Sequence, residues 1–170
     1  MRIILSDSEV SVAAYIGKAR NKNARSEGVP DAIRDYDSTS VGIDVDGMAA
    51  ELAVAKYLNV YPDIEIVKEN RPHHDLIFKG IYLEVKQSKY TNPRLLLSPN
   101  RIYVAENFGY ILVSGTIPIY TIVGYLPSKQ VQEVGEWIDL GKGRSWSVLS
   151  SQMKPIQDLV GYESFSYFKD

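Results

Sequence analysis

An aspartate and a Glu-x-Lys triplet lie close together in this 170-residue sequence, on either side of a short break that contains a glycine. Asp75 lies in a β-rich run over residues 73–78, and Glu84-Val85-Lys86 lies in a second such run over residues 81–87. The intervening Lys79-Gly80 suits a two-residue hairpin turn. Two carboxylates and an ammonium brought together by a hairpin could hold a hard divalent cation and leave positions for water and a phosphate oxygen.

The apolar pattern selects the register of the predicted hairpin. Because side chains alternate along a strand, a turn at residues 79–80 places one set of apolar residues on a single face: Leu76, Phe78, Ile81, Leu83 and Val85. Asp75, Glu84 and Lys86 then share the other face, with Asp75 directly opposite Glu84. A bulged three-residue turn would mix the two faces and is disfavoured. Opposed carboxylates with Cβ atoms about 5 Å apart repel each other unless a cation lies between them.

A third carboxylate could approach this hairpin from a helix. Residues 47–58 are rich in strong helix formers and end near Asn59, a suitable cap. Glu51 lies at helical spacing from Met48 and Val54, so it flanks the packing face of the predicted helix. The alternative is that Glu51 only stabilises the first half of the helix through the helix dipole. For the Glu-x-Lys triplet, the alternative is a solvated strand face.

Together these residues resemble the PD-(D/E)XK nuclease superfamily, whose motif is an aspartate followed after a short gap by Glu-x-Lys. Asp75 matches the aspartate, Glu84 and Lys86 match the triplet, and Glu51 matches a helical glutamate found in many members; His74 replaces the proline of the motif. The resemblance spans roughly Gly47 to Tyr125. It implies an α/β, restriction-endonuclease-like core with the order helix, three strands, helix, strand, and a central mixed sheet of four to five strands flanked by helices.

The same resemblance implies metal-dependent hydrolysis of phosphodiester bonds. Asp75 and Glu84 would hold one or two Mg²⁺ or Mn²⁺ ions, with the backbone carbonyl of Val85 as a further ligand. Lys86 would orient the attacking water or stabilise charge on the phosphoryl oxygens. Glu51 would bind a second ion or a water molecule on the metal. We therefore predict a nuclease with these four catalytic side chains, with nucleic acid as partner, DNA favoured, and with a homodimer as one assembly that could cut two strands.

The remaining sequence patterns predict one nuclease-like domain over residues 1–170. It would consist of an N-terminal helix and loop (1–46), a catalytic core (47–126) and a C-terminal extension with a helical tail (127–170). The capping box Ser6-x-x-Glu9 predicts a helix to about Ala19. The other expected elements are a short helix over 98–107, strands over 110–113 and 120–123, a helix from 127 toward 137 and a last helix over 156–160.

The formal net charge of −2 does not by itself indicate nucleic acid binding, but the basic residues are unevenly placed. Four of them fall within residues 18–25, where no acid occurs, and could grip phosphates; the alternative is a solvated helix end whose cations the helix dipole favours. The candidate nucleic acid contacts are Lys18, Arg20, Lys22, Arg25, His74, Gln87, Lys89 and Arg94.

Composition excludes several other classes. The absence of cysteine excludes disulfide scaffolds and cysteine zinc sites and agrees with a reducing cytoplasm, which is the expected location. The N-terminal apolar run is too short for a signal peptide, and the apolar stretch 110–126 is broken by Ser114-Gly115-Thr116 and Pro118, which predicts no membrane span. Three alternatives stay open: a catalytically inactive nucleic-acid-binding protein of the nuclease fold, an interaction protein, and a metallohydrolase that uses His73 or His74.

Overall fold

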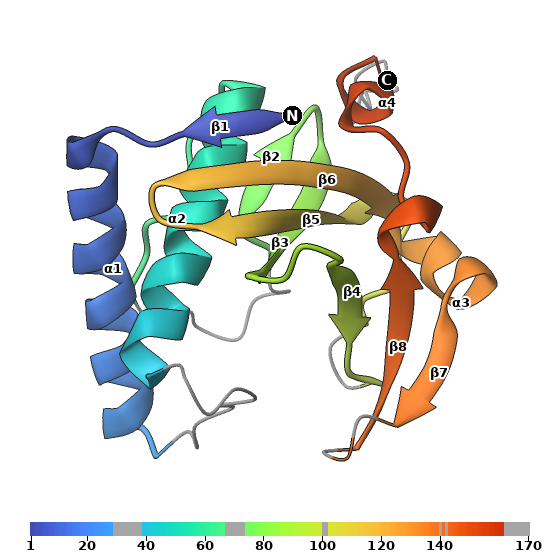
Figure 1. Ribbon diagram of the computed structural model, residues 1–170, viewed down its shortest axis with the longest axis horizontal. Helices are drawn as coiled ribbons and strands as arrows, with labels where there is room; N and C mark the ends of the chain where they lie inside the picture. Colours follow the sequence, from blue (N-terminus) through green and yellow to red (C-terminus); the bar gives the residue numbers. More distant parts are fainter. Residues whose placement is uncertain (29–38, 67–73, 100–101, 140, 142, 162–170) are drawn as a thin grey trace, which may run out of the picture.

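Five strands form a curled mixed β-sheet at the centre of the protein (Figure 1). The computed structural model describes residues 1–28, 39–66, 74–99, 102–139, 141 and 143–161. The strands of this sheet are β1 (Arg2–Ile4), β2 (Leu76–Phe78), β3 (Ile81–Ser88), β5 (Phe108–Thr116) and β6 (Ile119–Pro127). They lie in the order β1-β6-β5-β3-β2, with β3 and β5 parallel and the other neighbours antiparallel. The predicted α/β class with a mixed central sheet is therefore confirmed.

Helix α2 (Ser40–Leu58) packs on one face of this sheet, and helix α1 (Asp7–Ser26) packs beside it against α2 (Figure 1). Helix α1 begins at the predicted capping box, in which Ser6 and Glu9 each accept a backbone N–H of the other, and it continues past the predicted end near Ala19. Helix α2 ends where the sequence predicted, at a left-handed Asn59, but it begins earlier, because Thr39 accepts the N–H of Gly42 as an N-cap. None of the described helices is long and apolar enough to cross a membrane.

Small residues let the helices approach each other and the sheet. A Cβ atom added to Gly17 of α1 would lie 2.7 Å from the Cα of Val45 in α2, closer than real Cβ atoms come. On α2, the side chains of Ala49, Ala50 and Ala53 are completely buried in the cluster that joins both helices to the sheet. This close packing fixes α2, and with it Glu51, over β3.

A second sheet packs on the opposite face of the central sheet. Its strands are β4 (Arg94–Leu97), β8 (Arg144–Leu149) and β7 (Glu136–Asp139), in the order β4-β8-β7. A second apolar cluster, which contains residues of β4, β5 and β8, joins the two sheets. The helix predicted from 127 toward 137 is shorter than expected, because the 3₁₀ turn η2 (Ser128–Gln130) and helix α3 (Val131–Val134) end before Trp137. No strand was predicted in this extension, yet Trp137 lies in β7 and packs against its cross-strand partner Trp146 in β8. After the 3₁₀ turn η3 (Ser150–Gln152), helix α4 (Ile156–Val160) has the predicted bounds.

The predicted helix over residues 98–107 does not extend through the described residues of that stretch. Pro99 has 3₁₀ conformation, and its carbonyl accepts the N–H of Ile102 at 3.5 Å. Residues 102–105 have no regular structure, and residues 106–107 form a turn before β5. After Ile102, two backbone N–H groups donate to side chains: Tyr103 to the hydroxyl of Tyr110 at 3.0 Å, and Ala105 to the hydroxyl of Ser128 at 3.1 Å. After α2, the described chain forms β2, β3 and β4 and then β5, with no α-helix between β4 and β5 among the described residues. Of these strands, β4 belongs to the second sheet.

Candidate metal and nucleic-acid site

The hairpin that carries the Glu-x-Lys triplet has the predicted register. Leu76 pairs with Leu83 and Phe78 pairs with Ile81. The two turn residues, Lys79 and Gly80, have φ values of 50° and 78°. Two consecutive positive φ values are those of a type I′ turn, the connection that matches the twist of a two-residue hairpin.

Asp75 lies just before β2, where the regular ladder stops. Its N–H donates to the carbonyl of Leu83 at 2.8 Å, and its Oδ2 accepts the N–H of Val85 at 2.7 Å. A regular ladder would not join Asp75 to Leu83, because Leu83 already pairs with Leu76. Asp75 is therefore not the regular cross-strand partner of Glu84 that the sequence predicted; its carboxylate instead caps the edge of β3 beyond the end of β2.

Glu84 and Lys86 lie together on the face of β3 that points toward the second sheet. Their neighbours Leu83 and Val85 belong to the apolar cluster under α2, whereas Tyr110, the partner of Glu84 on β5, belongs to the cluster between the sheets. The Lys86 ammonium donates to Oε1 of Glu84 in a close ion pair. The Lys86 side chain keeps 28% of its surface exposed, so it also faces solvent.

Glu51 lies on α2, on the face of β3 opposite to Glu84. Its Oε2 lies 3.0 Å from Nη1 of Arg20 on α1. The Arg20 guanidinium also donates to the carbonyls of Asp63 and Glu65, at 2.8 and 3.0 Å. These internal contacts occupy all three guanidinium nitrogens of Arg20, and its contact with phosphate stays a prediction.

Burial distinguishes the three predicted acids from the other charged residues. Glu51, Asp75 and Glu84 are 9%, 7% and 8% exposed, and they are the only buried charged side chains in the described part of the chain. Burying a carboxylate is costly unless a cation or hydrogen-bond donor compensates. Each of the three has such a partner: a guanidinium, a backbone N–H and an ammonium, respectively.

The carboxylate and carbonyl oxygens at this site are of the type that hard cations prefer. The described side chains do not, however, form a complete set of metal ligands. The carbonyl of Val85 points to the same strand edge as its N–H, toward Asp75, because both groups of a strand residue face one neighbour. Oxygen ligands of this kind fit Mg²⁺. Within the described residues, however, no three His, Cys, Asp or Glu side chains lie close enough to hold a metal ion. Glu51 and Glu84 approach β3 from opposite faces, and Asp75 lies at the edge between them.

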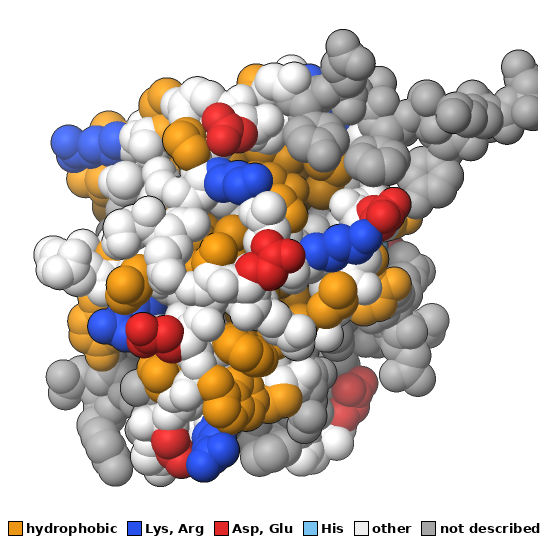
Figure 2. Space-filling model, turned by 90° about the vertical axis from the view of Figure 1, so that its right-hand side faces the viewer, with side chains coloured by type: hydrophobic (Ala, Val, Ile, Leu, Met, Phe, Trp, Pro, Cys, Tyr) orange, Lys and Arg blue, Asp and Glu red, His pale blue; other side chains and the backbone are white. Residues whose placement is uncertain are grey.

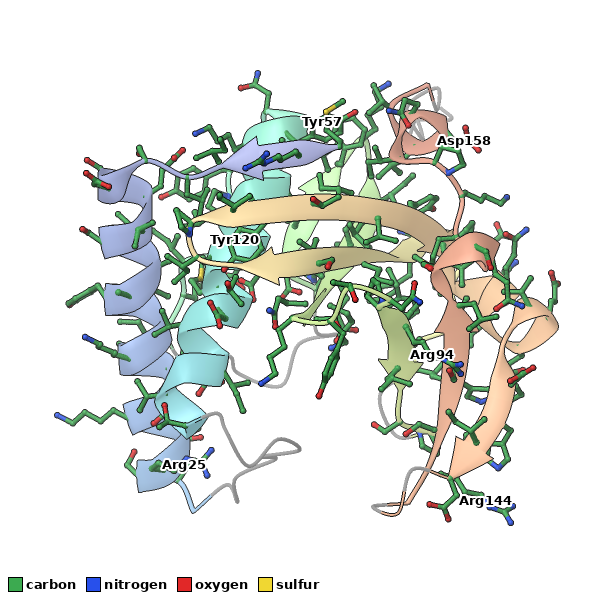
Figure 3. The ribbon with its side chains drawn as sticks, in the orientation of Figure 1. Arg25, Tyr57, Arg94, Tyr120, Arg144 and Asp158 are labelled. Atoms are coloured by element: carbon green, nitrogen blue, oxygen red, sulfur yellow. The ribbon has the colours of Figure 1, made fainter. Side chains whose placement is uncertain are left out.

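The other predicted nucleic acid contacts are dispersed. Lys18, Lys22 and Arg25 are exposed on α1, and Figure 3 shows Arg25 at the end of that helix and Arg94 on the second sheet, across the molecule. Gln87 donates to the carbonyl of Gly115 at 2.7 Å, so its amide is held within the central sheet. On the side of the second sheet, basic and acidic side chains are interspersed (Figure 2), and no single basic surface is visible there.

The remaining predicted residues lie nearer the hairpin. Lys89 is exposed just after β3. The ring of His74 packs edge-on against Tyr82, with centroids 4.8 Å apart, and Tyr82 lies on the same side of β3 as Glu84. His73, the other histidine considered as a ligand, lies outside the described residues. The structure thus leaves His74 as the described histidine that adjoins the candidate site.

Two neighbours of the site were not found by the sequence reasoning. Asp63 follows α2, and its Oδ2 lies 4.0 Å from Nη2 of Arg20; no periodic pattern marked it. Tyr110 is fully buried beside Glu84, and burial, with a smaller contribution from the Glu84 charge, raises the pKa of Tyr110 to about 12. Its phenol therefore stays protonated next to the site.

A comparison with protein-family models gives no match, and searches of curated proteins and of solved structures give no significant match. The resemblance to the PD-(D/E)XK nucleases thus stays a prediction from the residues themselves.

Proposed function

We propose that this protein is a metal-dependent nuclease with a restriction-endonuclease-like core, and that it hydrolyses phosphodiester bonds of nucleic acid, DNA in preference to RNA. The observation that supports this most directly is the selective burial of Glu51, Asp75 and Glu84 beside a partly exposed Lys86. Replacement of a buried ion pair by apolar residues of similar volume is often neutral or stabilising, so stability alone does not explain why three acids are buried here.

The proposed roles follow from the contacts of each residue. Asp75, Glu84 and the Val85 carbonyl would hold Mg²⁺ or Mn²⁺, whose chemistry there is to polarise the scissile phosphate and acidify a water molecule. The Val85 N–H holds the Asp75 carboxylate at the strand edge. Lys86 would turn its ammonium from Glu84 to the phosphoryl oxygens, where negative charge develops.

The test compares two Lys–Glu ion pairs of the same protein. Lys129 and Glu106 form an exposed pair 2.7 Å apart, and they serve as matched controls for Lys86 and Glu84. Linear, circular, branched and single-stranded DNA, and RNA, would be incubated with each variant in Mg²⁺ or Mn²⁺. We expect cleavage by the wild type, Lys129→Ala and Glu106→Gln, and none by Lys86→Ala or Glu84→Gln. Opening of the circular substrate would indicate endonuclease action.

Stability must be measured alongside, because Lys86→Ala leaves the Glu84 carboxylate buried without its cation. Glu84→Gln avoids that penalty and is the cleaner variant. Wild-type protein that cleaves no substrate with either metal would refute the proposal, and so would undiminished cleavage by Glu84→Gln.

A second candidate function is nucleic acid binding without catalysis. It is favoured by one observation: Glu51 and Glu84 already have basic partners, and no three-acid cluster lies among the described residues. This candidate predicts that the protein retards labelled DNA equally with and without Mg²⁺ and never cuts it.

A further inference from the structure

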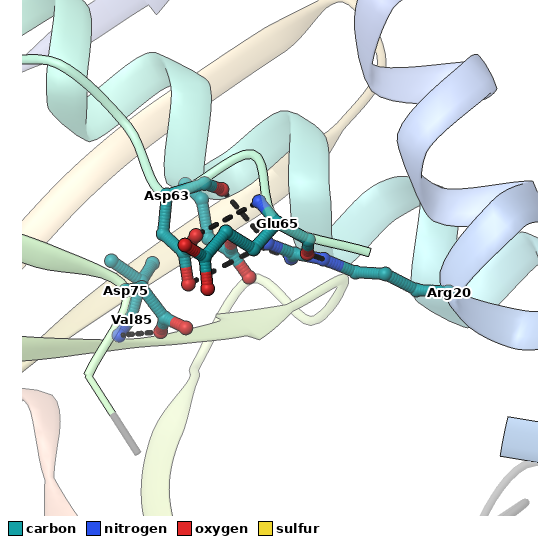
Figure 4. Close-up of polar contacts among 6 residues, drawn as sticks. Arg20, Asp63, Glu65, Asp75 and Val85 are labelled. Carbon is teal, nitrogen blue, oxygen red and sulfur yellow. Dashed lines mark hydrogen bonds and ion pairs between the residues drawn. The ribbon is translucent and has the colours of Figure 1, made fainter. Parts of the chain in front are cut away.

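Arg20 joins three separate segments near the candidate site. From α1, its guanidinium binds the carboxylate of Glu51 on α2 and the backbone carbonyls of Asp63 and Glu65 in the segment after α2 (Figure 4). That segment is held further by the N–H of Glu65, which donates to Oδ1 of Asp63 at 2.9 Å. All three guanidinium nitrogens are thus used, and only 15% of the side chain is exposed.

The same segment holds Asp75. The N–H of Asp63 donates to the carbonyl of Asp75 at 3.1 Å, immediately before β2. A continuous series of contacts therefore leads from Arg20 through Asp63 to Asp75, while a second contact of Arg20 fixes Glu51. Two of the three buried acids are thus linked to one guanidinium, Glu51 directly and Asp75 through Asp63.

We propose that Arg20 is a positioning residue, which sets Asp75 and Glu51 in place for the metal-dependent chemistry. The expected effect of Arg20 on metal binding rests on the proposed function, whereas its link to residues 63–65 does not. Arginine is required because a planar guanidinium with five donors can bind a carboxylate and two carbonyls at once, whereas the ammonium of lysine acts as a single compact charge. Arg20→Lys therefore keeps the positive charge and the pairing with Glu51 but loses the link to residues 63–65.

The first test is backbone hydrogen exchange in the absence of metal and nucleic acid. In Arg20→Lys and Arg20→Ala, we expect the amides of Asp63 and Glu65 to exchange at least tenfold faster, while amides of β5 and β6 keep their rates. Lys22→Ala, which removes an exposed cation from the same helix, serves as the control and should leave all these rates unchanged. Unchanged exchange at Asp63 and Glu65 in both Arg20 variants would overturn the inference.

The second test is Mn²⁺ binding, followed by the electron paramagnetic resonance signal of the free ion. Because Arg20→Lys preserves the positive charge, a loss of Mn²⁺ affinity would come from a changed position of Asp75 and Glu51 rather than from a changed charge. We expect this variant to bind Mn²⁺ at least threefold more weakly than the wild type and Lys22→Ala, at a similar melting temperature. Equal affinity would show that Arg20 does not position the site, even if exchange is faster. If the wild type binds no Mn²⁺ and cuts nothing, the proposed function fails, and hydrogen exchange alone decides the structural link.

Discussion

Two substitutions of Asp75 separate its structural role from its chemical role. Alanine removes both the hydrogen-bond acceptor and the negative charge, whereas asparagine removes only the charge. The carboxylate, 7% exposed, accepts the N–H of Val85 at 2.7 Å. In Asp75→Ala, that N–H loses its acceptor at a buried strand edge, which costs about 2–3 kcal/mol. Asp75→Asn keeps an acceptor oxygen, and a neutral hydrogen bond retains roughly half the strength of a charge-assisted one, so the loss is about 1 kcal/mol.

These energies convert to measurable shifts. For a chain of this length, 1 kcal/mol corresponds to about 2–4 °C in melting temperature, so we expect a drop of about 4–12 °C for Asp75→Ala and about 2–4 °C for Asp75→Asn. Urea unfolding followed by circular dichroism checks the free energies. Asp158→Asn, at an exposed position, should change neither stability nor cleavage.

Activity separates the two roles. The amide of Asp75→Asn cannot supply a negative ligand oxygen, so we expect cleavage to fall at least about 100-fold, a transition-state loss of roughly 2.7 kcal/mol, in a protein that remains folded. Equal destabilisation by alanine and asparagine would refute the reasoning about the Val85 contact. Undiminished cleavage by the asparagine variant would refute the assignment of Asp75 to the site.

Two further perturbations test the scaffold and the surroundings of the site. Gly17→Ala should destabilise the protein by about 1–3 kcal/mol in thermal unfolding, because the new methyl would meet Val45, whereas Gly47→Ala, with no neighbour within 4 Å, should stabilise it by up to about 1 kcal/mol through helix propensity. The pKa of Tyr110 is raised to about 12, chiefly by burial, so the folded state holds this proton more tightly than the unfolded state. The contribution of this proton to the free energy of unfolding is complete below about pH 10 and decreases by about 1.4 kcal/mol per pH unit up to about pH 12. In urea titrations at alkaline pH, Tyr110→Phe should therefore lose less stability over this pH range than the wild type does.

The hairpin was predictable because every local signal in it agrees. The apolar alternation, the Lys79-Gly80 turn and the length of both runs select one register, and the structure has it. The same holds for the capping box of α1 and the Asn59 cap of α2. In these segments, the interactions that fix the structure lie within a few residues of one another.

The errors lie where distant contacts decide. The segment after β4 has a proline-led helix signal, yet its amides donate to Tyr110 and Ser128, which no local pattern could indicate. Trp137 in β7 pairs with Trp146 in β8. These strands are short, and the third strand of their sheet, β4, is distant in sequence. The protein partners of Arg20, which lie 31 to 45 residues away in the sequence, were likewise not predicted. Periodicity identifies faces and carries no information about such partners.

Charge balance links the fold to the proposed chemistry. Glu51, Asp75 and Glu84 are largely removed from water, where interactions between charges are stronger than at the surface. Among the contacts of the described residues, the Glu84 carboxylate has the Lys86 ammonium as its counter-charge. Under the proposed function, a divalent cation bound to Glu84 would take over that part, which would leave the Lys86 ammonium available for a phosphate.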